Sequence, residues 1–232
     1  MNKINHHQLN PLATEILHIA RQAGKKILEI YDTDFSVNNK KDNSPLTAAD
    51  MAAHTTICDC LKALTPNVPI LSEESSITSF TERQRWHQYW LVDPLDGTRE
   101  FVKRNGEFSV NIALIEEEEP ILGVIHIPVT GVSYSASLHN GAYIHDNEGS
   151  TSPISVRKTV ANNITVAGSR SHGNEKQAAF IEKLEQPEIL AIGSSLKFCL
   201  VAEGKADIYP RFGLTSEWDT AAAQAIVEEA GG

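Results

Sequence analysis

The sequence has few cysteines, and their spacing does not suit a zinc site. Cys58, Cys60 and Cys199 are an odd number, and the first two lie two positions apart on a predicted helix, so their side chains point to different sides. A disulfide framework and a thiolate metal site are therefore both disfavoured. Buried, reduced cysteines in a cytoplasmic protein are the favoured interpretation.

Long apolar runs are also missing. No stretch approaches the roughly 20 apolar residues of a transmembrane helix, and the amino terminus, Met1 to His7, lacks the apolar core of a signal peptide. We therefore expect no integral membrane segment and a cytoplasmic location. Peripheral association with the inner membrane stays open, although no basic amphipathic helix supports it.

Positive charge is scarce: 20 Lys and Arg face 30 Asp and Glu, which gives a formal net charge of −10. This balance, without a basic stripe, argues against a nucleic-acid-binding module. It does not exclude a small anionic ligand, because a bound divalent cation inverts the local field. The acidic run from Glu116 to Glu119 precedes Pro120 between two apolar segments, so it predicts a solvated hairpin turn and not a calcium site.

With 232 residues, 41% of them hydrophobic, the chain can bury a substantial core. Residues 1–155 predict helices and an antiparallel sheet, whereas residues 156–232 alternate strands and helices in α/β order. His126 lies in an apolar strand without a nearby acid or thiol and is predicted to be a core histidine. The predicted helices span residues 9–30, 48–64, 175–184, 195–203 and 217–230; the predicted strands span 35–37, 68–71, 89–92, 108–115, 121–127, 131–136, 141–144, 164–167, 189–192 and 207–209.

Two aspartates follow the strand predicted at 89–92. Asp93 and Asp96 are separated by Pro94, which holds Asp93 extended, and are followed by Gly97, which allows a tight turn. Both carboxylates and the Leu95 carbonyl are therefore expected to point into one pocket. Oxygen donors without thiolate or imidazole suit a hard cation. A plain turn would use the same residue types, so this stretch alone does not decide.

Other polar residues have both a structural and a functional interpretation. Thr98 would open a helix whose free N–H groups receive a phosphate. Asp50 and Asp219 each lie three residues after a candidate N-cap, Thr47 and Ser216, so both fit capping boxes. Glu73 follows a predicted strand, where a solvated sheet edge is the commoner explanation.

Three segments together resemble the signature of the inositol monophosphatase superfamily of metal-dependent, lithium-sensitive phosphatases. They are Ser-Glu-Glu-Ser at 72–75, Asp-Pro-Leu-Asp-Gly-Thr at 93–98 and Trp-Asp at 218–219, in that order. Within the superfamily, the closer resemblance is to the 3′(2′),5′-bisphosphate nucleotidase branch. It is carried by residues 41–50, 91–101, 103–108, 193–204 and 206–211.

The resemblance implies a single catalytic domain over residues 1–232, folded as a layered αβαβα sandwich of the inositol monophosphatase and sugar phosphatase type. It implies Mg²⁺ as cofactor, with two or three ions, and hydrolysis of 3′-phosphoadenosine 5′-phosphate (PAP) to AMP and phosphate, which recycles a by-product of sulfate assimilation. Family members continue with a further strand and helix after the position of Gly232, so we expect a C-terminal piece to be missing. Arg99 stands where many relatives have lysine, and either residue supplies a cation.

The resemblance also assigns site residues. Glu73, Asp93, Asp96, Asp219 and the Leu95 carbonyl would hold the metal. Glu73 and Thr98 would orient the attacking water, with Asp50 accepting the Thr98 hydroxyl proton. Substrate binding falls to Gly97, Thr98, Ser194, Ser195, Lys197 and Asp219. At the start of the helix predicted at 195–203, an N-cap serine and a surface lysine are the structural alternative, and without the resemblance it would be favoured.

Two alternatives remain open. An inositol monophosphatase or another sugar-phosphate phosphatase would use the same metal core. A non-catalytic, metal-binding regulatory homologue is disfavoured because Glu73, Asp93, Asp96 and Asp219 are all present. The sequence does not predict the oligomeric state.

Overall fold

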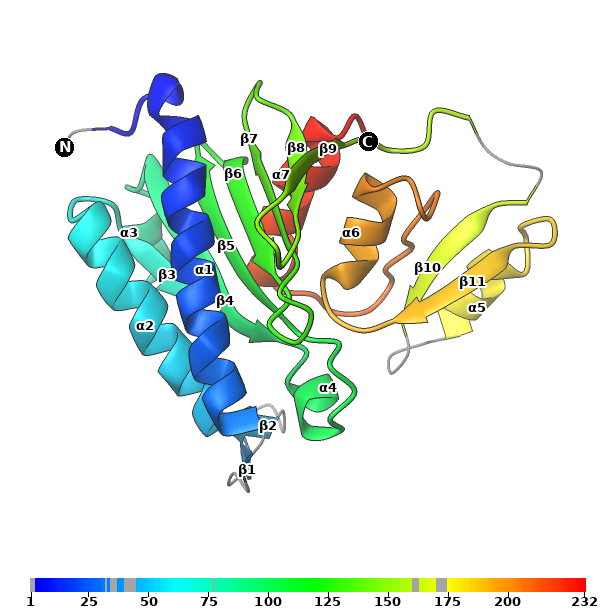
Figure 1. The fold of residues 1–232 in the computed structure, drawn as a ribbon, viewed down its shortest axis with the longest axis horizontal. Helices are drawn as coiled ribbons and strands as arrows, with labels where there is room; N and C mark the ends of the chain where they lie inside the picture. The colour runs from blue at the N-terminus through cyan, green and yellow to red at the C-terminus, as the bar shows by residue number, and fades with distance from the viewer. Residues whose placement is uncertain are drawn as a thin grey trace.

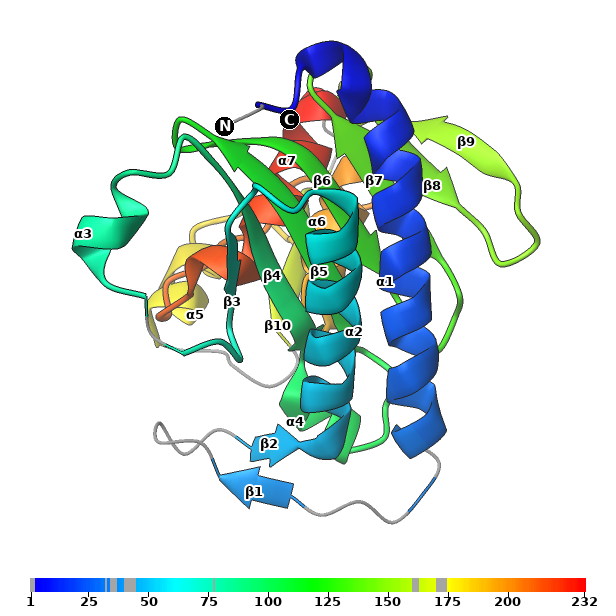
Figure 2. The ribbon, with the colours of Figure 1, turned by 90° about the vertical axis from the view of Figure 1, so that its left-hand side faces the viewer.

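The computed structural model describes residues 3–31, 33, 37–39, 45–76, 78–159, 163–169 and 175–232. Its centre is a seven-stranded sheet that has helices on both faces (Figure 1). On one face, α1 (Leu9–Tyr31) and α2 (Ala48–Leu64) lie side by side across the strands, as Figure 2 shows. Both helices were predicted, α1 from its apolar periodicity and α2 from a candidate N-cap at Thr47 and the stop before Pro66. The apolar face of α1 is buried as expected.

The sheet is mostly an antiparallel meander, as predicted. The strands lie in the order β3-β4-β5-β6-β7-β8-β9, and only the β3–β4 pair is parallel. Glu117 and Glu118 form the turn between β5 and β6 with positive φ angles of 48° and 75°, which confirms the predicted hairpin. The bounds are β3 Ile70–Ser72, β4 Gln88–Asp96, β5 Ser109–Glu116, β6 Glu119–His126, β7 Ser133–Ser137, β8 Ala142–His145 and β9 Thr151–Ile154.

Two short helices, α6 (Leu196–Ala202) and α7 (Ala221–Glu229), cover the opposite face of the sheet. Beyond α6 lie β10 (Thr165–Ser169) and β11 (Glu188–Ile192), which pair in parallel, together with α5 (Glu175–Ile181). The arrangement in Figure 1 is therefore a layered αβαβα sandwich, in agreement with the expected fold class.

Strand alternation separates the core into two clusters. Ile112 and Leu114 of β5 pack under α1 and α2, whereas Ala113, one position away, packs under α6 and α7. Asp93 of β4 pairs with Asn111 of β5, so both lie on the α6 and α7 face. The part of the polar site that the strands carry thus lies on the α6 and α7 face, whereas Asp50, described below, belongs to α2 on the other face.

Several elements differ from the sequence-based prediction. The strand expected at 207–209 is a single bridge between Val166 and Ile208. The helix expected at 217–230 is divided into a 3₁₀ turn, η2 (Glu217–Asp219), and α7, because the φ of Thr220 between them, −119°, departs from the helical value of about −63°. A short helix α3 (Phe80–Arg83) was not predicted; its N-cap Ser79 accepts a hydrogen bond from the Glu82 N–H.

The segment between α1 and α2 also departs from expectation. The strand predicted at 35–37 is β1 (Val37–Asn39), which pairs antiparallel with an unpredicted β2 (Pro45–Thr47). Residues 34–36 and the side chain of Thr47, the predicted N-cap, lie outside the described residues.

His126 is buried and bonded to Ser133 at 2.9 Å, as the core prediction required. Within the described ranges, no helix is long and apolar enough to cross a bilayer.

Candidate active site

The end of β4 forms the first part of the site. The strand was predicted to end at Val92, but it continues through Asp96. Its register with β5 shifts between Asp93 and Asp96. The Leu95 N–H donates to Asp93 Oδ1 at 3.1 Å across this irregularity. Such a bulge re-aims side chains, which lets two carboxylates three positions apart face the same side.

Gly97 makes the turn from β4 into the short helix α4 (Thr98–Val102). Its φ is +94°, in the region that glycine tolerates, and a Cβ there would lie 3.0 Å from the Glu107 carbonyl oxygen. The tight turn and the helix beginning at Thr98 are therefore confirmed. The Thr98 hydroxyl donates to the Leu95 carbonyl at 3.4 Å, so its predicted contact with Asp50 stays a prediction.

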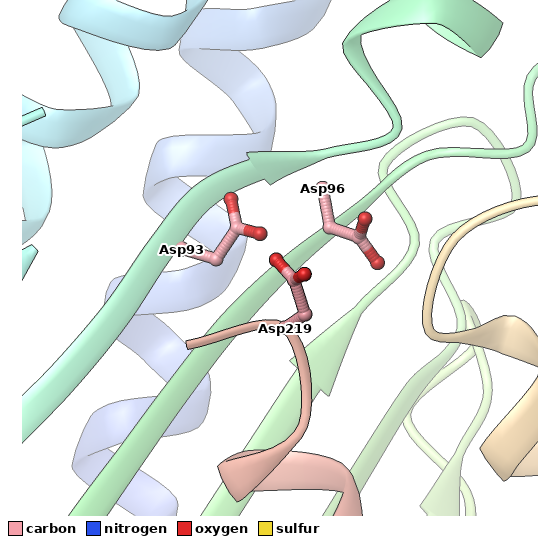
Figure 3. Close-up of side chains that lie close together, drawn as sticks. All are labelled: Asp93, Asp96 and Asp219. Carbon is pink, nitrogen blue, oxygen red and sulfur yellow. The ribbon is translucent and has the colours of Figure 1, made fainter. Parts of the chain in front are cut away.

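Three aspartates converge at the end of β4 (Figure 3). Asp93 and Asp96 come from β4 and Asp219 comes from η2, and each offers an oxygen within 4.8 Å of the other two. The Ser216 N–H donates to Asp219 Oδ2 at 3.0 Å and so orients this carboxylate. The capping contact and the cluster are thus compatible uses of the same side chain.

The cluster is electrostatically unfavourable without a cation. Burial raises the pKa of Asp93 well above its usual range, and the charges of Asp96, Glu73, Asp219 and Asp50 raise it further. Burial and the Asp96 charge raise the pKa of Asp219 to about 6. Hard oxygen donors in mutual repulsion are the set that a divalent cation stabilises, so the residues present fit Mg²⁺.

Two further predicted acids lie near the cluster. Glu73 directly follows β3, where its N–H donates to the Val92 carbonyl at 3.1 Å, and it lines the same cavity as the aspartates. Asp50 is fully buried in the first turn of α2, and its charge contributes to the raised pKa of Asp93. The parallel β3–β4 pair therefore brings Glu73 beside Asp93 although they are distant in sequence.

A cavity of about 660 Å³ opens onto the aspartates. Besides the predicted residues, it is lined by side chains for which no role was predicted: Glu100, Ser169, Phe198, Tyr209, Arg211, Leu214, Thr215 and Thr220. Tyr209 and Arg211 belong to the segment 206–211 that carried the nucleotidase resemblance, so a signal for them existed. Phe198 meets the Tyr209 ring edge to face at 4.8 Å between centroids.

The predicted substrate residues before and within α6 are held by the protein itself. Ser195 is buried, and its hydroxyl donates to Asp96 Oδ2 at 2.7 Å. Lys197 is also buried, which lowers the pKa of its ammonium; that group donates to the Ser194 carbonyl at 2.5 Å and lies 5.3 Å from the centre of the Tyr209 ring. Ser194, Ser195 and Lys197 nevertheless all line the cavity.

Comparison with known proteins places these observations in a family. The sequence profile of the inositol monophosphatase family matches residues 8–232. The 3′(2′),5′-bisphosphate nucleotidase CysQ of Escherichia coli (strain K12) is 51% identical over 219 residues, which cover 94% of this chain and 87% of that protein. CysQ of Haemophilus influenzae is 38% identical, covering 100% of this chain and 85% of its own length.

Solved structures give the same result. CysQ from Bacteroides thetaiotaomicron, described as a bacterial member of the inositol monophosphatase family, superposes with a TM-score of 0.83 at 40% identity, covering 95% of this chain and 87% of that one. The extragenic suppressor protein suhB from Bartonella henselae has a TM-score of 0.80 at 26% identity, with 95% and 85% covered.

Proposed function

The chain belongs to the inositol monophosphatase family, and we propose that it is a metal-dependent phosphatase that removes the 3′-phosphate of PAP to give AMP and phosphate. The observation that carries this proposal is the convergence of Asp93, Asp96 and Asp219 on one cavity. The substrate is inferred from relatives that are named 3′(2′),5′-bisphosphate nucleotidases and are about half identical to this chain.

We assign the metal to Asp93, Asp96, Asp219, Glu73 and the Leu95 carbonyl, all of which line the cavity. Mg²⁺ bound there would neutralise charge on the phosphoryl oxygens and lower the pKa of a bound water. Phosphate monoester hydrolysis is among the slowest uncatalysed reactions, so both effects are needed. Two or three ions, and action in the cytoplasm, stay predictions.

The chain's own groups would position the reactants. Glu73 is assigned to orient the attacking water together with the Thr98 hydroxyl, and Asp50 to accept the Thr98 proton. Gly97 and Thr98 line the cavity and stay the predicted N–H donors to the phosphate. Arg99, on the same wall, would add a cation near the phosphoryl oxygens.

The wall of the cavity away from the carboxylates supports a nucleotide. Phe198, Tyr209 and Leu214 present aromatic and apolar surface to it, and Arg211 presents a guanidinium that donates to the Thr215 hydroxyl at 2.8 Å. Such a wall suits a base and a second phosphate better than the polyhydroxylated ring of an inositol phosphate. Ser194 and Lys197 stay the predicted contacts on this side.

Phosphate release from PAP and from inositol 1-phosphate, measured side by side with Mg²⁺ and again with a chelator, tests the proposal. We expect a higher kcat/KM for PAP and loss of activity in the chelator. A preference for inositol 1-phosphate would assign the chain to the sugar-phosphate phosphatases instead. Hydrolysis of neither substrate by folded, Mg²⁺-loaded protein would favour a non-catalytic homologue.

A further inference from the structure

The Ser195 hydroxyl joins two of the three clustered aspartates. It lies 2.7 Å from Asp96 Oδ2 and 3.0 Å from the backbone carbonyl oxygen of Asp219. Asp96 ends β4 and Asp219 ends η2, so one buried side chain connects the two segments that bring the carboxylates together. Only 2% of Ser195 is exposed.

A chain of hydrogen bonds from β5 sets the direction of this hydroxyl. The Asn111 side-chain amide donates to Ser195 Oγ at 3.0 Å, and the Asn111 carbonyl oxygen accepts from the Ser109 hydroxyl at 3.1 Å. Since the Asn111 amide occupies a lone pair of Ser195 Oγ, the hydroxyl proton is left for the acceptors on the other side, Asp96 and Asp219. The Ser195 hydroxyl therefore donates its proton to groups of the protein itself.

The backbone before Ser195 is held in place independently. Ser194 has a left-handed φ of +46°, a conformation that a serine keeps only when its surroundings impose it. The Lys197 ammonium binds the Ser194 carbonyl at 2.5 Å, and the Gly193 N–H donates to Glu107 Oε2 at 2.8 Å. A Cβ at Gly193 would lie 2.9 Å from the Glu107 carbonyl oxygen, so this turn cannot easily move away.

We propose that Ser195 is a positioning residue for the metal site: its hydroxyl fixes one oxygen of Asp96 and ties the Asp219 turn to it, so that both carboxylates meet the same cation. This inference rests on the proposed metal site and replaces the expected contact of Ser195 with the substrate. Partners of this kind orient ligand side chains and govern metal affinity without touching the ion.

Binding of Mn²⁺, followed by electron paramagnetic resonance of the free ion with no substrate present, measures the effect. In Ser195→Ala we expect Mn²⁺ affinity about 10- to 100-fold weaker than in the wild type, the range found when such partners are lost. Circular dichroism of the same samples establishes that the variant is folded.

A matched control comes from a buried serine of the seven-stranded sheet. Ser133 is fully buried on β7 and bonds His126 at 2.9 Å, away from the aspartates. Ser133→Ala loses a hydroxyl hydrogen bond of the same kind, so it should lower the melting temperature and leave Mn²⁺ affinity unchanged. A purely structural role for Ser195 would make the two variants behave alike.

A second substitution separates hydrogen bonding from packing. Ser195→Cys keeps a γ atom of slightly larger size but offers only a weak donor, so it should bind Mn²⁺ about as weakly as Ser195→Ala. Wild-type affinity in either variant overturns the positioning role. Failure of the wild-type protein to bind Mn²⁺ overturns the metal site itself, and with it this inference, so the two failures are distinguishable.

Discussion

The two faces of the seven-stranded sheet are packed by different means. Under α1 and α2 most of the core side chains are large, among them Trp90, Ile112 and Leu114, all fully buried. Under α6 and α7 it is rich in alanine, and the first turn of α7 contributes three in succession, residues 221–223. The large residues bury more apolar area and therefore contribute more to stability.

Small residues serve a different purpose, because they let backbones approach closely. At Gly123 of β6, an added Cβ would lie 2.2 Å from the Ala222 carbonyl oxygen. Ala222 is three residues after Asp219, so this close contact sets the distance between the backbone of Asp219 and the sheet. The comparison teaches that one face supplies stability while the other supplies the geometry of the site.

The largest expected effect comes from a substitution that impairs the site on the α6 and α7 face and leaves the core under α1 and α2 intact. Asp93→Asn removes one charge from the proposed metal site and no core volume, so turnover of PAP should fall by roughly 10³-fold, about 4 kcal/mol in barrier. The melting temperature should not fall. Asp59→Asn, the same substitution on the exposed side of α2, is the control and should retain activity. Near wild-type turnover by Asp93→Asn at limiting Mg²⁺ would contradict the metal assignment.

The next prediction concerns the core on the opposite face of the sheet, under α1 and α2. Leu114→Ala should lower the free energy of unfolding by about 3 kcal/mol, since it opens a cavity among fully buried side chains. Denaturant unfolding measures this loss. The kcat of the fraction that stays folded should equal that of the wild type; a parallel fall in kcat would show that the two faces are not separate.

Low pH should reduce the stability of the protein through His126, which lies on the α1 and α2 face of the sheet. Burial, with the Arg21 charge, lowers the pKa of this histidine from 6.5 to about 4. The unfolded chain therefore takes up a proton first, and the stability that His126 contributes is complete above pH 6.5 and is lost as pH falls toward 4. Between pH 7.5 and 4.5 the loss is about 2–3 kcal/mol.

The contribution of His126 to the pH dependence of stability is obtained by comparing the wild type with a variant that lacks this histidine. His126→Gln should unfold with a shallower dependence on pH than the wild type over this window, while the other titrating groups, including His145 and the aspartates, are common to both proteins. Equal pH dependence of the two unfolding free energies would rule out the neutral core histidine.

The smallest expected change sharpens the comparison. Gly123→Ala and Gly24→Ala place the same methyl group at helix–sheet contacts on opposite faces, the second 2.6 Å from the His126 ring. Gly123→Ala should cost about 1–3 kcal/mol of stability through overpacking and lower Mn²⁺ affinity by moving Asp219. Gly24→Ala should leave Mn²⁺ affinity unchanged. Equal Mn²⁺ affinities in both variants would refute the role given to close packing.

Local sequence patterns predicted the elements whose causes are local. The periodicity of α1, the β5–β6 hairpin at Glu117 and Glu118 and the turn at Gly97 each follow from properties of the residues themselves. The resemblance added the fold and the pairing of Glu73 with the later aspartates, which no local pattern contains.

Tertiary contacts decided what the sequence missed. The helix predicted at 217–230 breaks after Asp219, whose carbonyl oxygen accepts a hydrogen bond from Ser195. The φ of the next residue, Thr220, is −119° and departs from the helical value of about −63°. Helical propensity cannot report a partner that is distant in the chain. The contact between Ser195 and Asp96 spans 99 positions, which is why a serine expected at the substrate proved to be bonded to a proposed metal ligand.

The position of a bound ion tests the central claim most directly. Crystals grown with Mn²⁺ would reveal it by anomalous scattering. The account predicts density between the carboxylates of Asp93, Asp96 and Asp219 on the α6 and α7 face of the sheet. Mn²⁺ located elsewhere on the protein, with these three carboxylates free of it, would contradict the account.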